Sequence, residues 1–283
     1  MSDRVTILVN SCDKYEDAWH PFFECLWHFA GALPYPIILN TETKTYCSPH
    51  YSVLCINTET SKRLTWSQRL LHVLTSVNTE FVFFLLEDYF LKAPFDRERF
   101  ESVLTYMHTH PDVCFTDVKP RYAASPEQQM QNRILYADAP DTFLERNHPH
   151  YNITCSPGIW RTDALKSLLR PHEDIWDFEV YVGIRAKKAN WKVIRFETRS
   201  PGLYEYDDQI MGGGMGITAG RWLPANKPFF DSLGIAVNYD RLGIMDASSI
   251  EEIRSTIRRN PISMIKKVPM KIRKRINRRK SLQ

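Results

Sequence analysis

The feature of the sequence that most restricts the fold is an unbroken apolar run, Phe81–Leu86, whose letters are FVFFLL. A strand with one face in water alternates apolar and polar residues, so a strand without polar positions must be covered on both faces. Such strands are typical of mostly parallel sheets that carry helices on both sides. The run is far too short to cross a membrane. We therefore expect an α/β fold with this strand inside its sheet.

The residues before this run alternate between strand and helix patterns, as a parallel sheet requires. Apolar, β-branched stretches alternate with segments in which apolar residues recur every three or four positions. Asp17 is the expected N-terminal cap of the first helix. The expected strands are 4–10, 36–40, 53–56 and 80–86, and the expected helices are 17–29 and 65–77.

The second half of the chain has the same kinds of element in a less regular order. Residues 112–150 are mixed in character, contain prolines and predict no element. A glycine-rich run at 211–216 predicts a loop, and it has neither the Lys-Ser/Thr ending of a P-loop nor the spacing of a dinucleotide fingerprint. The expected helices are 96–110, 161–169 and 176–188, and the expected strands are 151–160 and 191–196.

The composition excludes several classes of protein. Hydrophobic residues make up 43% and charged residues 25% of the 283 residues, which is typical of a folded globular protein and not of a disordered chain. No secretory signal opens the sequence, so we expect a cytoplasmic protein with reduced thiols. The six cysteines form no CxxC pair and have no zinc-finger spacing, and we expect neither disulfides nor zinc.

The end of the sequence differs in charge from the rest. Residues 261–283 contain nine of the 37 Lys and Arg residues and none of the Asp or Glu residues, so the remainder of the chain is slightly acidic. Apolar residues recur among these cations at near-helical spacing, which is typical of a helix that lies on an anionic membrane surface. A disordered, solubilising tail and a nucleic-acid-binding tail are the alternatives. We expect an anionic membrane surface as the partner and no nucleic acid.

Two acidic residues, Glu87 and Asp88, follow the apolar strand directly. In an open α/β sheet, ligands bind beyond the carboxyl ends of the strands. Two neighbouring carboxylates repel each other unless a cation offsets their charge. A Mg²⁺ or Mn²⁺ ion bound to a diphosphate is a suitable partner, because such ions take carboxylate and phosphate oxygens together. The alternative is a solvated acidic turn without a ligand.

A second acidic pair occurs in the segment Trp176-Asp-Phe-Glu179. A carboxylate placed against an acceptor hydroxyl can act as the general base for its attack on a sugar, and apolar neighbours raise the basicity of such a group. The alternative is that Asp177 and Glu179 are acids at a helix N-terminus, where the helix dipole favours them. Arg63 and Arg69, ahead of the apolar strand, are suited to a diphosphate or else are solvated at the surface.

Taken in order, these motifs resemble a known family. The chain carries SCDKY after its first strand, TWSQRLLHVL in a helix, FVFFLLEDYFL at the apolar strand, and SPGIWRTDALKSLL followed by DIWDFEVYVG. Over residues 4–200 they resemble the GT-A-type glycosyltransferases of bacterial capsule and O-antigen (lipopolysaccharide) biosynthesis clusters. The resemblance implies a GT-A fold over 1–245, with a mostly parallel central sheet and helices on both faces. It also implies a nucleotide-sugar-binding half (1–110), an acceptor-binding half (111–245) and a basic amphipathic tail (246–283).

The resemblance implies roles for particular residues. Glu87 and Asp88 take the place of the family's DXD-like element, with Asp88 as the ligand of Mn²⁺ or Mg²⁺. Because Glu-Asp-Tyr is not a strict Asp-x-Asp, the need for a metal is left open. Glu179 takes the place of the general base, with Asp177 as the alternative. The nucleotide sugar is expected to contact Ser11, Asp13, Tyr15, Arg63, Trp66 and Arg69, and the acceptor to contact Tyr89, Trp160 and Trp176.

The implied reaction transfers a sugar from a nucleotide-sugar donor, taken as UDP-linked, to a glycan or lipid-linked acceptor. It is a direct displacement that inverts C1, carried out at the inner face of the cell membrane. One alternative is a sugar nucleotidyltransferase, although the glycine-rich loop usual in such enzymes is absent from Ser11–Tyr15. The other is a catalytically silent nucleotide-sugar- or glycan-binding protein, which would keep the fold without needing Asp88 or Glu179.

Overall fold

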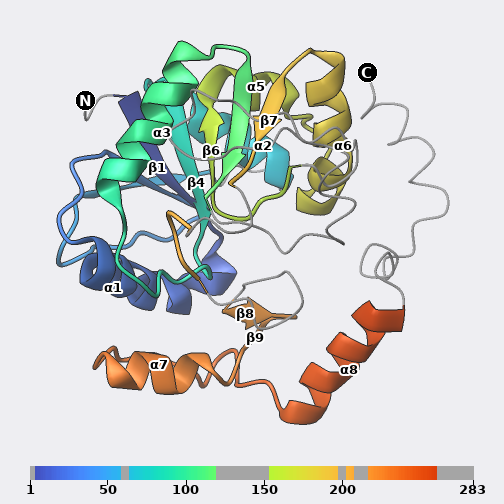
Figure 1. Cartoon of the computed structure of the whole chain (residues 1–283). Helices are drawn as coiled ribbons and strands as arrows, with labels where there is room; N and C mark the ends of the chain where they lie inside the picture. Colours follow the sequence, from blue (N-terminus) through green and yellow to red (C-terminus); the bar gives the residue numbers. More distant parts are fainter. Residues whose placement is uncertain (1–3, 59–63, 119–152, 197–201, 207–215, 260–283) are drawn as a thin grey trace.

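A seven-stranded sheet forms the centre of the protein (Figure 1). The computed structural model describes residues 4–58, 64–118, 153–196, 202–206 and 216–259. The strand order is β3-β2-β1-β4-β6-β5-β7, so the apolar strand β4 lies in the middle. The strands are β1 (Val5–Asn10), β2 (Ile37–Thr41), β3 (Val53–Asn57), β4 (Phe81–Leu86), β5 (Val113–Asp117), β6 (Gly158–Arg161) and β7 (Lys192–Ile194).

The strands of this sheet are parallel to their neighbours except β6. Strand β4 pairs in parallel with β1, from Phe81 opposite Val5 to Leu86 opposite Asn10. Strand β6 runs antiparallel to both β4 and β5. It begins at Gly158, where a Cβ atom would clash with the ring of Phe115, so this position requires glycine. The expected mostly parallel sheet is confirmed, with one reversed strand.

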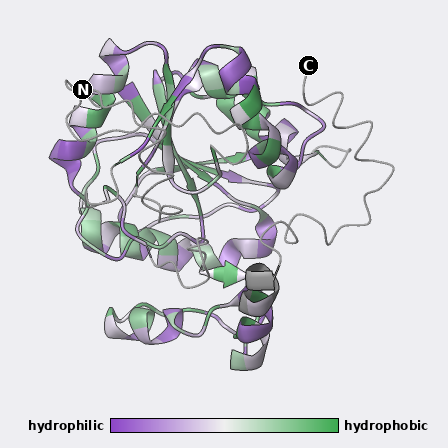
Figure 2. Ribbon diagram, turned by 45° about the vertical axis from the view of Figure 1, so that its right-hand side comes forward, coloured by the Kyte–Doolittle hydropathy of each residue, from purple (hydrophilic) through white to green (hydrophobic). Residues whose placement is uncertain are grey.

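Helices cover both faces of the sheet, as an apolar central strand requires. Phe81, Phe83 and Leu85 pack into one core cluster with α1 and α3, whereas Val82 and Phe84 pack into a second cluster with α2, α5 and α6. Figure 2 shows the hydrophobic residues concentrated on the central strands. The helices are η2 (Asp13–Ala18, a 3₁₀ helix), α1 (Trp19–Ala30), α2 (Trp66–Leu74), α3 (Arg97–Thr109), α5 (Thr162–Leu168) and α6 (Ile175–Lys188).

Side-chain caps fix where three of these helices begin. At α2, Thr65 Oγ1 accepts a hydrogen bond from the Gln68 N–H at 3.1 Å, and Gln68 Oε1 accepts one from the Thr65 N–H at 2.9 Å. This reciprocal capping box satisfies two backbone donors at the helix start. Asp96 caps α3 and Asp174 caps α6 more simply, because each carboxylate accepts a hydrogen bond from one backbone N–H of the first turn.

Three details of the expected secondary structure are wrong. Residues 112–150 were expected to form no element, but β5 (Val113–Asp117) lies there and pairs with β6 and β7. Asp17 does not cap α1, because residues 13–18 already form η2 and lead directly into α1; its carboxylate accepts a hydrogen bond from Arg241 Nε at 2.7 Å. The strand expected at 151–160 begins only at Gly158, because the preceding Cys155 N–H donates to a side chain on α6 and not to a neighbouring strand.

The chain after the sheet forms a group of elements beside the carboxyl ends of the strands. They are the hairpin of β8 (Ile217–Thr218) and β9 (Arg221–Trp222), α7 (Asn226–Ser232) and α8 (Ala247–Arg259). The Trp222 ring stacks on Phe90, with centroids 5.9 Å apart, and the Gly216 N–H donates to the Asp88 carbonyl oxygen at 2.6 Å. The hairpin is thus held against the segment that follows β4.

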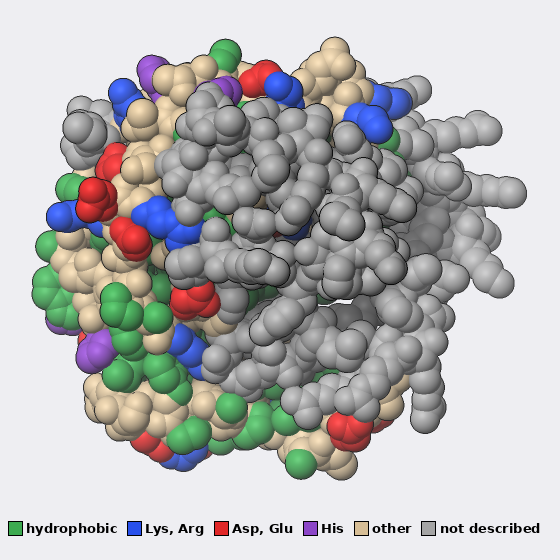
Figure 3. Space-filling model, viewed as in Figure 1, with side chains coloured by type: hydrophobic (Ala, Val, Ile, Leu, Met, Phe, Trp, Pro, Cys, Tyr) green, Lys and Arg blue, Asp and Glu red, His purple; other side chains and the backbone are tan. Residues whose placement is uncertain are grey.

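The described surface is mixed in charge. Figure 3 shows acidic and basic side chains interspersed over the described part of this face. Among the helices that the structure describes, none has the length and apolar character needed to cross a membrane. The basic segment 261–283 lies outside the described residues.

Candidate functional site

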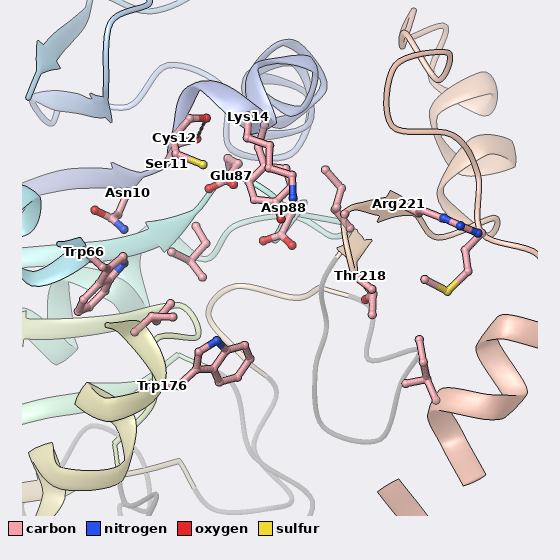
Figure 4. A pocket seen from close by; sticks show the side chains of 18 of the residues that line it. Asn10, Ser11, Cys12, Lys14, Trp66, Glu87, Asp88, Trp176, Thr218 and Arg221 are labelled. Carbon is pink, nitrogen blue, oxygen red and sulfur yellow. Dashed lines mark hydrogen bonds between the residues drawn. The ribbon is translucent and has the colours of Figure 1, made fainter. Parts of the chain in front are cut away.

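A cleft of about 790 Å³ opens where β1 and β4 end. The loop after β1, the first turn of α2 and the residues after β4 form one wall. The first turn of α6, the β8–β9 hairpin and α8 form the rest (Figure 4). Adjacent parallel strands that end at the same edge of a sheet place their following loops side by side, which is where ligands bind in open α/β folds.

Most of the residues expected to bind the donor line this cleft together. They come from segments far apart in the sequence. The parallel pairing of β1 with β4 brings the loop after β1 next to Glu87 and Asp88, which follow β4. The lining residues that were expected from the sequence are Ser11, Tyr15, Trp66, Arg69, Glu87, Asp88 and Trp176.

The acidic pair after β4 is almost completely buried. Glu87 is 6% exposed and Asp88 is 8% exposed. Burial and the neighbouring Asp88 raise the pKa of Glu87 well above its ordinary value, although Ser11 and Arg69 partly oppose this. Burial raises the pKa of Asp88 to about 7, opposed by the N–H groups of Asp88 itself and of Ile217. Near neutral pH the pair therefore carries less than its full charge unless a cation is present.

The polar groups around this acidic pair come from the loop after β1 and from α2. Arg69 Nη1 donates to the Ser11 carbonyl at 3.3 Å and lies 3.3 Å from Glu42 Oε1. The Ser11 hydroxyl accepts a hydrogen bond from Trp19 Nε1 at 2.7 Å, which fixes the loop on α1. Burial raises the pKa of Cys12 to about 11, and it raises the pKa of Tyr15 to about 12. Both groups are therefore neutral at physiological pH, and each offers a proton for hydrogen bonding.

The carboxylates fit a divalent cation that arrives with a ligand. Among the described residues, no group of three His, Cys, Asp and Glu side chains is arranged to hold a metal ion. Glu87 and Asp88 supply carboxylate oxygens only, and Mg²⁺ or Mn²⁺ is commonly held by one or two carboxylates while phosphates and water fill the other positions. The charge that burial suppresses in this pair is the charge that such a cation would restore.

Three of the residues expected to contact the donor or the acceptor lie elsewhere. The Asp13 carboxylate accepts hydrogen bonds from the N–H groups of Glu42, Thr43 and Lys44, so it holds the loop after β2. Burial opposes these bonds, but they dominate and lower the pKa of Asp13. Its position suits support of the site and not direct contact with a ligand in the cleft.

The two aromatic residues among the three are in the core. Trp160 is 1% exposed on β6 and packs against Phe115 and Phe178, with centroids 4.7 and 6.1 Å away. Tyr89 is 6% exposed and meets the Tyr206 ring edge-on at 4.9 Å. Neither lines the cleft. Arg63 lies outside the described residues.

The two candidate bases lie on α6, next to a residue that reaches the cleft. Trp176 lines the cleft and is 49% exposed. Glu179 Oε1 accepts a hydrogen bond from the Cys155 N–H at 2.7 Å, and the Asp177 N–H donates to the Asp174 cap at 2.8 Å. Asp177 and Glu179 are partly exposed and do not line the cleft as it stands.

A buried ion pair fixes the start of α6 against α2. Arg185 donates two hydrogen bonds to Glu173, at 2.7 and 2.8 Å, and the two side chains are 3% and 0% exposed. The Glu173 carbonyl accepts from the Ser67 N–H at 3.3 Å, and Thr65 Oγ1 donates to the Pro171 carbonyl at 2.6 Å. The first turns of α2 and α6, which carry Trp66 and Trp176, are therefore joined at one wall of the cleft.

The wall formed by the β8–β9 hairpin and by α8 was not expected from the sequence. The hairpin turns through Ala219 (φ 51°) and Gly220 (φ 78°), and both line the cleft together with Lys14 and Arg221. Strands of two residues have too short a pattern to be recognised. Gly220, which adopts positive φ without strain, was the available signal for a tight turn, whereas an alanine at positive φ cannot be foreseen from sequence. Lys14 was passed over between two residues that were expected to bind the donor.

Comparison with known proteins finds matches among solved structures but none by sequence. No family model matches the chain, and no curated protein is similar in sequence. Among solved structures, S. aureus TarS residues 1–349 in complex with UDP-GlcNAc is similar at 13% identity and a TM-score of 0.46, over 96% of this chain and 77% of that chain. In a longer TarS chain, the matched part is 36% of that chain.

Two further solved structures are similar to a comparable degree. The mannosyltransferase PcManGT from Pyrobaculum calidifontis, in complex with GDP-Man and Mn²⁺, matches at 11% identity and a TM-score of 0.46, over 69% of this chain and 55% of that chain. A CMP:2-keto-3-deoxy-manno-octonic acid synthetase complexed with CTP matches at 14% identity and a TM-score of 0.44, over 82% and 98%. Such low identities and TM-scores indicate a similar course of the chain, and they identify no residue of the site.

Proposed function

We propose that the protein is a glycosyltransferase that uses a nucleotide-sugar donor. The observation that carries this proposal is the buried pair Glu87–Asp88, which lies at the end of β4 in a cleft that also contains Arg69. Acids that burial leaves short of charge, beside a cation and at the ligand-binding edge of an α/β sheet, suit a ligand that brings both a diphosphate and a metal ion.

The donor side of the proposal uses the loop after β1 and the first turn of α2. Ser11 and Tyr15 contact the nucleoside, which is taken as uridine, while Trp66 and Arg69 lie toward the diphosphate. A Mn²⁺ or Mg²⁺ ion held by Asp88, with Glu87 beside it, would offset the charge of the diphosphate. Arg69 is 12% exposed and stays charged, so it supplies a fixed positive charge near the leaving group.

The acceptor side of the proposal uses the first turns of α6. Trp176 offers a half-exposed ring for a sugar or another apolar face of the acceptor. Glu179, or Asp177 in its place, takes the proton from the acceptor hydroxyl as that oxygen bonds to C1 of the donor sugar. The bond from C1 to the diphosphate oxygen breaks, and the nucleoside diphosphate leaves with the electron pair. The displacement inverts C1.

The cellular setting is proposed from the sequence. A glycan or lipid-linked acceptor in surface polysaccharide synthesis, met at the inner face of the cell membrane, agrees with the basic, amphipathic segment 261–283. That segment would hold the enzyme near an acceptor that is itself anchored in the membrane.

The test is hydrolysis and transfer with a panel of nucleotide sugars, with and without Mn²⁺ or Mg²⁺. The wild-type protein should slowly hydrolyse one donor, and Asp88→Asn and Glu179→Gln should lose this activity. Asp231→Asn serves as the matched control, because Asp231 is 56% exposed and pairs with Lys227 on the surface, away from the cleft. Binding of a nucleotide sugar without cleavage under any metal would instead indicate the silent binding protein, and absence of binding would overturn the proposal.

A further inference from the structure

Three cationic side chains line the cleft, and two of them are already paired. Arg69 lies against Glu42 and the Ser11 carbonyl, and Arg221 lies 3.7 Å from Asp246. Lys14 makes no ion pair with any residue that the structure describes, and its Nζ lies 5.2 Å from the centre of the Tyr15 ring. Lys14 is therefore the cation of this cleft that a ligand can engage without breaking an existing pair.

The ammonium group of Lys14 lies against the turn of the β8–β9 hairpin. A Cβ atom on Gly220 would be 3.2 Å from Lys14 Nζ, so the missing side chain of Gly220 leaves room for the ammonium. In Figure 4 the Lys14 side chain points from η2 toward Asp88, with Thr218 of the hairpin on the far side of that carboxylate. The cation thus stands at the Asp88 side of the cleft.

A buried hydroxyl lies on the same side. Thr218 is 7% exposed, lines the cleft, and its Oγ1 has no hydrogen-bond partner among the residues that the structure describes. A buried polar atom without a partner is costly, so such an atom in a cleft wall is commonly satisfied by a ligand or an ordered water. Lys14 and Thr218 together offer a positive charge and a hydroxyl donor.

The two carboxylates of the acidic pair differ in the groups that face them. Arg69 acts on Glu87, whereas Asp88 receives the Ile217 N–H from the hairpin. Arg69 is the protein cation on the Glu87 side of the pair. One divalent ion does not offset the whole charge of a diphosphate, so a second protein cation is needed on the Asp88 side. Lys14 occupies that side. A lysine suits the task because it is a compact charge on a flexible stem, and lysines bind phosphates in this way.

We propose that Lys14, assisted by the Thr218 hydroxyl, binds the diphosphate of the nucleotide-sugar donor and remains with it as it leaves. The inference rests on the proposed function and adds a binding residue and a second protein wall to the donor site. The negative charge on the diphosphate grows as its bond to C1 breaks, so the ammonium stabilises the transition state more than the bound donor.

The test compares the binding of each nucleoside diphosphate with that of its own nucleoside, which lacks the phosphates. Isothermal titration measures the binding of UDP, GDP and CDP and of the matching nucleosides to the full chain, with EDTA and with Mn²⁺. Wild-type protein, Lys14→Met, Lys14→Arg and Thr218→Val are compared with Lys227→Met as the matched control, because Lys227 pairs with Asp231 on α7, away from the cleft. The Lys14 carbonyl accepts from Arg241 Nη2 at 2.9 Å, so the backbone anchor of this loop survives substitution of the side chain.

The expected result is a loss of diphosphate affinity in Lys14→Met of about 10- to 100-fold, the range of one charge-assisted hydrogen bond. Nucleoside affinity stays unchanged, Lys14→Arg keeps most of the affinity, and Thr218→Val loses less. The inference is overturned if the wild type prefers a diphosphate to its nucleoside and Lys14→Met keeps that preference, which leaves the proposed function standing. If the wild type binds no diphosphate and no nucleotide sugar, the proposed function and this inference fall together.

Discussion

Asp88 shows how one residue can make stability depend on pH. Its pKa is raised from 3.8 to about 7 in the folded protein, chiefly by burial. The folded state therefore binds a proton more tightly than the unfolded state, and stability falls as pH rises through the range between these two values. We expect Asp88→Asn to be more stable than the wild type at pH 8 by about 1–3 kcal/mol, and equal to it near pH 4.

Thermal unfolding in EDTA across this pH range checks the expectation. A difference of about 1 kcal/mol shifts the Tm of a chain of this size by about 2–4 °C. Mn²⁺ added at pH 8 should raise the Tm of the wild type more than that of Asp88→Asn, because the substitution removes one of the two carboxylates that would hold the ion. A Tm difference that stays the same at every pH would show that the substitution acts through packing and not through the charge.

Glu179 and Asp177 differ in what their removal should do. Glutamine at 179 keeps an oxygen that can accept the Cys155 N–H, so Glu179→Gln removes the base while it preserves the fold. If Glu179 is the general base, kcat should fall by about 10²- to 10⁴-fold, whereas the KM for the donor stays nearly constant. Asp177→Asn should change kcat only a few-fold.

Steady-state kinetics with the preferred donor and acceptor separate these outcomes, with the Tm of each variant as the check on folding. The reverse pattern, a large loss in Asp177→Asn alone, would make Asp177 the base. Full kcat in both variants would place the base outside the first turns of α6.

At the scale of elements, the joint between α2 and α6 positions two tryptophans of the cleft. Arg185→Met leaves the Glu173 carboxylate buried without its partner, and such a loss destabilises proteins by about 3–5 kcal/mol. We expect a matching fall in Tm and a raised KM for the acceptor, because Trp176 follows Glu173 by three residues on the wall that the pair anchors. The double variant Glu173→Leu, Arg185→Met should recover most of the Tm.

Chemical denaturation of the two single variants and the double variant measures the coupling between the side chains. A double variant as unstable as Arg185→Met would mean that packing around Arg185, and not the unpaired charge, carries the effect. A raised KM that persists in the fully stable double variant would show that the ion pair also sets the position of Trp176.

Elements with a long, regular pattern could be predicted from the sequence, and short ones could not. Strand β4 and helices α2 and α6 follow from apolar periodicity and capping residues, which are local properties. Strand β6 is shorter than expected because its upstream N–H at Cys155 bonds to a distant helix. The β8–β9 hairpin depends on contacts with Phe90 and Asp88, which lie more than a hundred residues earlier in the chain.

At the scale of the whole molecule, the same distinction holds for the site. Ser11, Glu87 and Asp88 could be predicted because they follow strands, and strand ends meet at one edge of a parallel sheet. Trp160 was expected near the acceptor from the family resemblance, but the alternation of β6 turns it into the core between Phe115 and Phe178. Direction along a strand and the partner on the opposite face are set by the tertiary structure, which local patterns do not encode.

The basic segment 261–283 should determine where the whole molecule acts. Each Lys or Arg near an anionic surface contributes about 1 kcal/mol of binding free energy, and salt screens it. We expect the full chain to bind vesicles rich in phosphatidylglycerol and not vesicles of phosphatidylcholine, with binding lost at high salt. Replacing the nine Lys and Arg residues of this segment by Gln should remove about 4 kcal/mol or more of binding free energy by the same estimate, which lowers vesicle binding at low salt by at least about 1000-fold.

Co-sedimentation with vesicles measures this, and activity separates docking from catalysis. If the segment serves docking alone, the substituted protein should keep its kcat on a soluble acceptor and lose rate only on an acceptor embedded in vesicles. The control replaces Lys187, Lys188 and Lys227 on the described body by Gln and should bind vesicles as the wild type does. Equal losses in both variants would mean that general charge, and not this segment, holds the protein at the membrane; unchanged binding in both would remove the membrane from the proposal and leave a soluble glycan as the acceptor.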